Sequence, residues 1–271
     1  MFLEGLCVTL MLCTATATAA DEISREQIIA DKGCADCDLV LRSLRDLNIE
    51  NADFSEATLR EADLKAAMLP GGKFREGDLQ RTEAEKAVFT AADFTHAKMR
   101  NIDLEKAVLK DAVLHKADLR DADLSEADLS GADLTDADLR GALVRRASLM
   151  GARLTDVLAR DADFERTDLA GAVLVDGDFQ RSDFDRADLS GAVLSGADLS
   201  GGRFTSANFS GADFGNANVD DALLRRTNLA GADLSDVRGL TKTQLRLACG
   251  DDKTRLPRGF TIAKCPAIML D

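Results

Sequence analysis

Two cysteines near the N-terminus have the spacing of a redox motif. Cys34-Ala-Asp-Cys37 places two thiols three positions apart, and a Cys-x-x-Cys pair with a lowered thiol pKa can exchange disulfides with a substrate. Thioredoxin-like sites place this motif between a strand and a helix, a context that is missing here. A zinc site would need further ligands, and none stands nearby. A structural disulfide is the preferred interpretation, and a thiol–disulfide function using Cys34 and Cys37 is kept as an alternative.

The two histidines, His96 and His115, are the other side chains that invite a chemical interpretation. Asp111 lies close to His115 in the sequence, so a surface metal site is conceivable, but both histidines fall at positions that should face solvent. No nucleophile–base pair, phosphate-binding glycine loop or dinucleotide fingerprint is found. We therefore expect a protein that is not an enzyme, with no catalytic residues, no metal and no cofactor.

A repeat of five residues determines how these side chains must be positioned. From Phe54 to Leu234 an apolar residue, nearly always Leu or Phe, recurs at every fifth position through 37 units without an insertion. A small residue, usually Ala, stands two positions earlier, as in Ala-Asp-Leu-Ser-Glu-Ala-Asp-Leu at 122–129. A period of five fits neither an α-helix nor a flat strand. It indicates a chain that turns a corner every five residues, with the apolar and small residues inside and the other three positions toward solvent.

This pattern resembles the A-(D/N)-L-x-x consensus of the pentapeptide repeat family of bacterial proteins. The resemblance covers most of the chain and implies an all-β fold, a right-handed quadrilateral β-helix with four units in each coil. The sequence supports a coil of twenty residues independently, because phenylalanines recur at that spacing in two series: Phe54, Phe74 and Phe94, and Phe164, Phe184 and Phe204. With coils stacked about 4.8 Å apart, the solenoid would be a rod about 45 Å long.

The first twenty residues have the layout of a secretory signal peptide. An apolar run at 6–13 is followed by small residues up to Ala20, although Glu4 and the lack of Lys or Arg make the first residues atypical. The run is too short to cross a bilayer, so no transmembrane segment is expected. We predict a periplasmic or secreted protein whose signal peptide is residues 1–20.

The remainder of the chain should divide into a repeat region between two caps. We expect an N-terminal cap with the Cys-x-x-Cys pair at 21–38, the β-helix at 39–236 and a C-terminal cap and tail at 237–271. Open ends of a solenoid need covering. The spacing of a capping box at 24–27 and again at 241–244 predicts a short helix in each cap.

Four cysteines lie outside the expected signal peptide, namely Cys34, Cys37, Cys249 and Cys265. They allow three pairings, but two of these would join opposite ends of the rod, which disulfide geometry excludes. If the cysteines are oxidised, the bonds are Cys34–Cys37 and Cys249–Cys265. The family often starts its repeats with Cys-x-x-Cys, which also implies a structural bond there, and an exported location permits both.

The acidic charge of the chain belongs to the repeats. The net charge is −14, and the acidic excess before Cys37 cancels the basic excess after Asp236. Such a surface repels nucleic acid, so no direct nucleic-acid binding is expected. Acidic residues spaced by twenty positions, with one gap, form a line that is the candidate binding surface: Asp63, Glu83, Asp103, Asp123, Asp163 and Asp183.

These observations predict a non-catalytic exported scaffold, an acidic rod that offers flat faces to a protein partner whose identity stays open. Apolar residues at the same spacing, such as Val113, Val173 and Val193, make a homodimer a further possibility. The resemblance supplies an alternative, because the quinolone-resistance branch of the family mimics B-DNA and binds DNA gyrase. Basic residues interrupt the acidic lines, and a signal peptide conflicts with a cytoplasmic target, so the scaffold is preferred.

Overall fold

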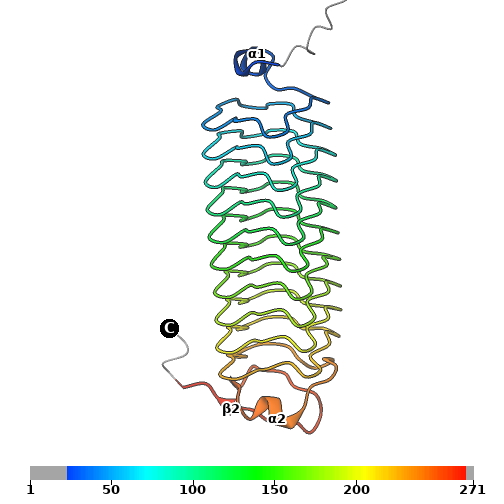
Figure 1. The fold of residues 1–271 in the computed structure, drawn as a ribbon. Helices are drawn as coiled ribbons and strands as arrows, with labels where there is room; N and C mark the ends of the chain where they lie inside the picture. The colour runs from blue at the N-terminus through cyan, green and yellow to red at the C-terminus, as the bar shows by residue number, and fades with distance from the viewer. Residues whose placement is uncertain (1–22, 267–271) are drawn as a thin grey trace, which may run out of the picture.

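The computed structural model describes residues 23–266, which form one long stacked coil (Figure 1). Parallel bridges join residues twenty positions apart, beginning with Gly33 and Asp53 and continuing to Asn218 and Arg238. One coil therefore contains twenty residues, and its four five-residue units make four sides. The expected signal peptide at 1–20 lies outside the described residues. No described helix is both long and apolar enough to span a membrane.

The interior is a single column of apolar side chains. The small and the large apolar residue of each unit are buried, as Ala122 and Leu124 illustrate. Phenylalanine rings stack along two sides, with centroids 4.8 Å apart for Phe74 and Phe94 and 4.7 Å apart for Phe164 and Phe184. These contacts confirm the coil of twenty residues that the phenylalanine spacing indicated. The two stacks lie half a coil apart, so they support opposite sides of the rod.

The unit 122–126 shows where the backbone N–H groups of the repeat go. Three of the five donate to carbonyls of the neighbouring coils, those of Asp123, Leu124 and Glu126, at 2.9, 2.7 and 2.8 Å. The N–H of Ala122 donates across the corner before it, at 3.1 Å. The N–H of Ser125 donates to Oδ1 of Asp123 at 2.9 Å. The recurring Asp therefore supplies a hydrogen-bond acceptor for the one backbone N–H of the unit that has no carbonyl partner.

The corners explain two further sequence preferences. The second corner residue has a positive φ in nearly every unit, 59° for Glu126 and 66° for Gly71, which is the requirement of a type II turn. Pro70 stands before Gly71, at the corner position whose N–H normally needs the Asp acceptor. Proline has no N–H, and the residue at the acceptor position of this unit is Met68 rather than Asp.

A short helix lies at each end of the coil (Figure 1). Helix α1 (Arg25–Ala30) begins after Ser24, whose hydroxyl accepts from the N–H of Gln27, and it buries Ile28 over the first coil. Helix α2 (Lys242–Leu245) has both hydrogen bonds of a capping box, between Thr241 and Gln244. The Gln244 amide also donates to the carbonyls of residues 219 and 222, at 2.8 and 3.0 Å, so α2 is fixed to the last coil.

The segment after α2 stands where the next coil would be. Strand β1 (Cys249–Gly250) accepts from the N–H of Leu229 at 2.8 Å, and Arg255 accepts from Leu234 at 2.9 Å. Strand β2 (Ala263–Lys264) then pairs in parallel with β1. At the other end the regular bridges already begin at Gly33, within the segment expected to form the N-terminal cap.

Candidate protein-interaction surface

The structure brings the predicted acidic residues into one column. Bridges join Asp63 to Glu83 and continue through Asp103 to Asp123. Asp163 and Asp183 continue the same column after one interruption by Leu143. All six occupy the centre of the same side of the rod.

The carboxylates in this column also have a structural role. In each of its five Asp residues, Oδ1 accepts the N–H two positions later, at 2.9 to 3.1 Å. The side chains are consequently half-buried. The expectation that this repeat position faces solvent is correct only in part, because the carboxylate folds back onto its own corner.

Basic side chains from neighbouring coils balance part of the column. Arg145 lies 2.6 Å from Asp163 and Arg203 lies 3.0 Å from Asp183. Near the other end, Lys65 lies 3.1 Å from Glu83. Asp103 and Asp123 have no ion pair among the described residues, so the middle of the column keeps uncompensated charge.

Asp103 is a carboxyl group of this column whose ionised form is disfavoured. Burial raises its pKa, and a hydrogen bond to the Glu85 carboxyl and the charge of Asp123 act in the same direction. Lys65 holds the pKa of Glu85 below its usual range. Burial also raises the pKa of Asp183. A cation placed against these carboxylates would stabilise their ionised forms, which favours a basic ligand here.

The net negative charge is highest on this side of the rod. Between residues 41 and 235, each side consists of its central residues and the two lines of corner residues that adjoin it. The side with the acidic column, called the acidic face, has 14 acidic and seven basic residues. The opposite side has six acidic and three basic residues. The side centred on Met68, Val88 and Val108 has six acidic and seven basic residues. The fourth side has 11 acidic and seven basic residues, so the acidic face has the largest net negative charge of the four sides.

A hollow of about 360 Å³ interrupts the acidic face at its middle. It forms because Ser125 is short while its neighbours in the corner line, Glu105 and Arg145, are long. Asp123, Glu126, Arg146 and Glu165 complete its walls. The spacing of the repeat alone did not identify this feature, although the break in the charged corner line at Ser125 is visible in the sequence. The hollow could accept one basic side chain.

The two disulfides occupy opposite ends. Cys34 bonds to Cys37 across the first corner, with Cα atoms 5.6 Å apart, and Cys249 bonds to Cys265 with Cα atoms 4.7 Å apart. These are the pairs expected for an oxidised chain. Cys34 is buried and takes the place of the large apolar residue of its unit. Since its sulfur belongs to the core, a substrate thiol would have little access to it.

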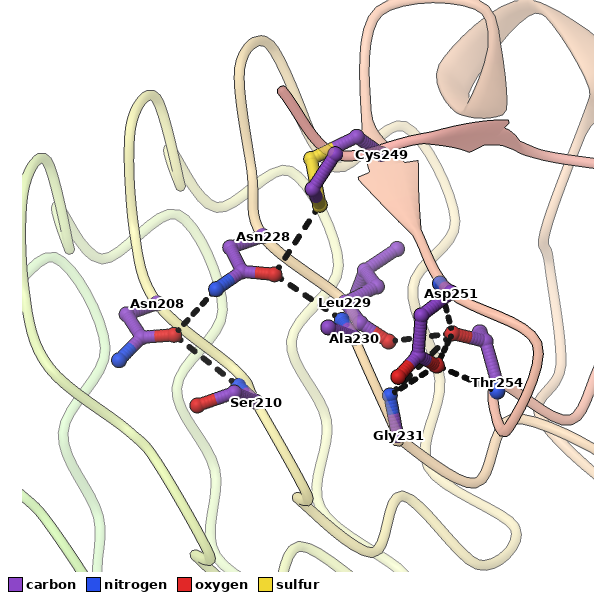
Figure 2. Close-up of a disulfide and its surroundings, with 10 residues drawn as sticks. Asn208, Ser210, Asn228, Leu229, Ala230, Gly231, Cys249, Asp251 and Thr254 are labelled. Carbon is purple, nitrogen blue, oxygen red and sulfur yellow. Dashed lines mark hydrogen bonds between the residues drawn. A yellow bond between two sulfur atoms is a disulfide. The ribbon is translucent and has the colours of Figure 1, made fainter. Parts of the chain in front are cut away.

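The second disulfide joins Cys265, the residue after β2, to Cys249 in β1 (Figure 2). Sγ of Cys265 lies 3.2 Å from Oδ1 of Asn228. Oxidised sulfur has no proton to donate, so this is a packing contact. In the same region Asp251 accepts from the N–H of Gly231 at 2.8 Å, and the Thr254 hydroxyl donates to the carbonyl of Leu229 at 2.9 Å (Figure 2).

The histidines do not form a metal site in the described part of the chain. Their ring centroids are 6.0 Å apart, and Nδ1 of His115 lies 3.0 Å from the carbonyl oxygen of Thr135. No group of three or more His, Cys, Asp or Glu residues there could hold a metal ion. Asp111, which the sequence placed near His115, takes no part in any such group.

The family model described as pentapeptide repeats matches the chain at residues 43–81, 87–125, 107–146, 117–156, 147–186, 162–201 and 203–238. No match was found among curated proteins.

Solved structures of repeat proteins are also similar. HetL, a pentapeptide repeat protein involved in heterocyst differentiation regulation from the cyanobacterium Nostoc sp. strain PCC 7120, is 30% identical, with a TM-score of 0.51 and coverage of 77% of this chain and 91% of that one. QnrB1, a plasmid-mediated fluoroquinolone resistance protein, is 18% identical, with a TM-score of 0.45 and coverage of 68% and 92%. A protein of the Arabidopsis thaliana thylakoid lumen is 30% identical, with a TM-score of 0.27 and coverage of 50% and 82%. The last two superpose too loosely to carry an argument.

Proposed function

The chain belongs to the pentapeptide repeat family, whose members fold as right-handed quadrilateral β-helices, and on that premise we propose that it is a non-catalytic scaffold that binds a protein partner along the acidic face. The observation that carries the proposal is the uncompensated charge at Asp103 and Asp123 beside the Ser125 hollow. Such a surface is complementary to a protein that presents Lys or Arg side chains. The helices α1 and α2 and the segment 247–255 act as caps, which leaves the sides as the docking surface.

We propose further that the scaffold is exported. The apolar and small-residue layout of residues 1–20 supports export, and the two disulfides support it as well, because such bonds persist in oxidising compartments. The test is cell fractionation with mass spectrometry of the N-terminus and a count of free thiols. A periplasmic product that begins near Asp21 and has no free thiol is expected. An uncleaved cytoplasmic product with reduced cysteines would contradict export, but it would not contradict the proposal that a protein binds the acidic face.

A photo-crosslinking amino acid at position 125 tests the docking surface in the source cell. We expect it to capture one protein reproducibly, while the same amino acid at position 171, on the opposite side, does not capture that protein. The captured protein, once purified, should bind the full chain with an affinity that falls as salt rises, because surface charges are screened. Asp123→Arg should weaken that binding at least about tenfold. Equal binding by wild type and variant would reject the acidic face as the site.

The gyrase alternative remains a prediction with its own assay. One basic residue for every two acidic ones on the acidic face argues against a DNA-like line of charge. We expect no inhibition of gyrase supercoiling by the purified chain. Inhibition that is lost in the Asp123→Arg variant would replace the scaffold proposal with gyrase binding.

A further inference from the structure

The side of the rod opposite the acidic face has an unusual central column. Bridges join Arg153 to Val173, Val173 to Val193 and Val193 to Asp213. The two valines are half-buried, whereas the two charged residues at the ends are exposed. We call these four residues the valine column.

The borders of this column are bare. Gly151, Gly171, Gly191 and Gly211 form one corner line, with φ between 64° and 68°. A Cβ atom at any of the four would meet nothing within 4 Å. Comparable corner positions elsewhere hold long side chains at similar φ, such as Arg146 at 54°, so neither crowding nor φ alone requires glycine. The other border has only short side chains, at 155, 175, 195 and 215.

The charged residues at the ends of the column have no salt-bridge partner within residues 23–266. Neither Arg153 nor Asp213 makes an ion pair among the residues described. Asp213 uses Oδ1 to accept from the N–H of Gly215 at 2.9 Å, which leaves Oδ2 available. This contrasts with Asp163 on the acidic face, whose second oxygen binds Arg145 at 2.6 Å.

The four residues are arranged symmetrically about the midpoint between the valines. Arg153 lies one coil before Val173, and Asp213 lies one coil after Val193. A twofold axis through that midpoint, perpendicular to the rod, superimposes the position of each valine on that of the other and the position of Arg153 on that of Asp213. Opposite charges at symmetry-related positions are what an isologous interface requires.

We propose that two copies of the chain pack antiparallel through the valine column. Val173 then contacts the partner's Val193, and Arg153 pairs with the partner's Asp213, each contact occurring twice. The glycine border lets the two sheets approach closely without ordering long side chains. One coil further out Asp133 meets the partner's Asp233, and Arg255 lies 3.1 Å from Asp233 in its own chain, so a cation is present where those two carboxylates meet.

This dimer is small and therefore reversible. A contact of about six coils, each about 4.8 Å high, buries roughly 700 Å² in total, below the area of a standard stable interface. The valines supply apolar burial at the centre, and the charge pairs set the antiparallel register. The inference does not depend on the proposed function, because the acidic face stays exposed on both outer sides of the dimer.

Charge reversal tests the pairing directly. The full chain should sediment as a monomer–dimer equilibrium in analytical ultracentrifugation. Arg153→Asp alone and Asp213→Arg alone each put like charges together and should weaken dimerisation at least about tenfold. An equimolar mixture of these two variants should associate again, because each contributes the partner that the other lacks. The double variant R153D/D213R should dimerise like the wild type.

The control is Lys98→Asp, a reversal at the same repeat position on another side, where the lysine is also exposed. It should leave the dimer unchanged. Circular dichroism and melting temperature verify that every variant is folded. A wild-type chain that stays monomeric up to its solubility limit would overturn the proposal. So would single variants that dimerise normally, or a mixture that fails to restore association.

Discussion

Nδ2 of Asn228 donates to Oδ1 of Asn208 at 3.0 Å across neighbouring coils (Figure 2), and Nδ2 of Asn208 donates in turn to Oδ1 of Asp188 at 3.0 Å. An amide both donates and accepts, so it can bridge stacked residues where two carboxylates would repel. Each amide oxygen still accepts the corner N–H two residues later, at 3.1 Å in Ser210 and 3.0 Å in Ala230. The last coils are thus linked by side chains as well as by backbone.

The first prediction concerns this amide ladder. Asn208→Asp removes the donor to Asp188 and places two carboxylates in contact, so the free energy of unfolding should fall by about 1–2 kcal/mol at neutral pH. The new carboxyl pKa would be raised in the folded state, so the loss should shrink as pH falls through that pKa. Urea unfolding of the wild type and the variant at several pH values measures this loss of stability. Asn101→Asp, at an exposed corner, is the control and should have little effect.

The second prediction separates the charge of the recurring Asp from its hydrogen bond. Asp168 makes no ion pair in the described chain, and its Oδ1 accepts from the N–H of Ala170 at 3.0 Å. Asp168→Ala leaves that N–H without an acceptor and should cost about 1 kcal/mol. Asp168→Asn keeps the acceptor and should be close to neutral. Equal losses for both variants, measured by thermal unfolding, would mean that charge and not turn capping explains the Asp.

The third prediction concerns the core. Leu124 and Leu129 are buried, and truncation of either to Ala should cost about 2–5 kcal/mol, because the single column of side chains cannot close the cavity. Leu223→Ala is the matched control, since this leucine is 55% exposed, and it should cost less than about 0.5 kcal/mol. Chemical denaturation of the three variants gives the comparison. A cost at Leu223 equal to that at Leu124 would contradict the buried column.

The fourth prediction concerns the raised pKa of Asp103. Burial and the neighbouring carboxyl groups disfavour its charged form in the fold, so the folded pKa lies above the unfolded one. Its ionised form therefore lowers stability at pH values above the folded pKa, and this cost shrinks as pH falls through the folded pKa and disappears below the unfolded pKa. Asp103→Asn keeps the acceptor for the N–H of Glu105, at 3.0 Å in the wild type. The variant should be more stable at pH 7, by less than about 1 kcal/mol, and no more stable at pH 3. A melting temperature that rises equally at both values would refute this explanation.

The fifth prediction concerns the C-terminal disulfide. The two cysteines of this bond are 16 positions apart, whereas Cys34 and Cys37 are 3 apart. Closing a loop of 16 residues lowers the entropy of the unfolded chain and so stabilises the fold by about 3 kcal/mol. In C249S/C265S, residues 256–264 should exchange their amide hydrogens faster, while the coils up to residue 218 stay protected. Hydrogen exchange with mass spectrometry resolves the two regions. Loss of protection throughout the coil would show that the bond stabilises the whole rod.

The repeat made the twenty-residue coil, its buried residues and the alignment of its phenylalanines predictable. A strict period determines which residues lie next to each other in neighbouring coils. The same arithmetic placed Asp63 and Asp183 in one column. It did not show that Asp123 folds back to its corner, since the period assigns a side and not a side-chain conformation. The sequence also did not show that basic side chains neutralise part of the acidic column. Arg145 contacts Asp163, 18 positions later, and only the stacked coils bring these two residues together.

The hollow at Ser125 and the symmetry of Arg153 and Asp213 were hidden for a different reason. Each depends on departures from the consensus, a short residue in one place and an unpaired charge in another. A single sequence gives such departures no more weight than any other substitution. Their meaning depends on which neighbours surround them after stacking.

The 37 units contain no insertion, and the four-sided coil gives that regularity a consequence for evolution. Five added residues would leave every unit intact, but they would move all later columns to the next side and cut each surface in two at that point. Twenty added residues would lengthen the rod by one coil and keep all four surfaces continuous. Length can therefore change only in steps of a whole coil if the surfaces matter.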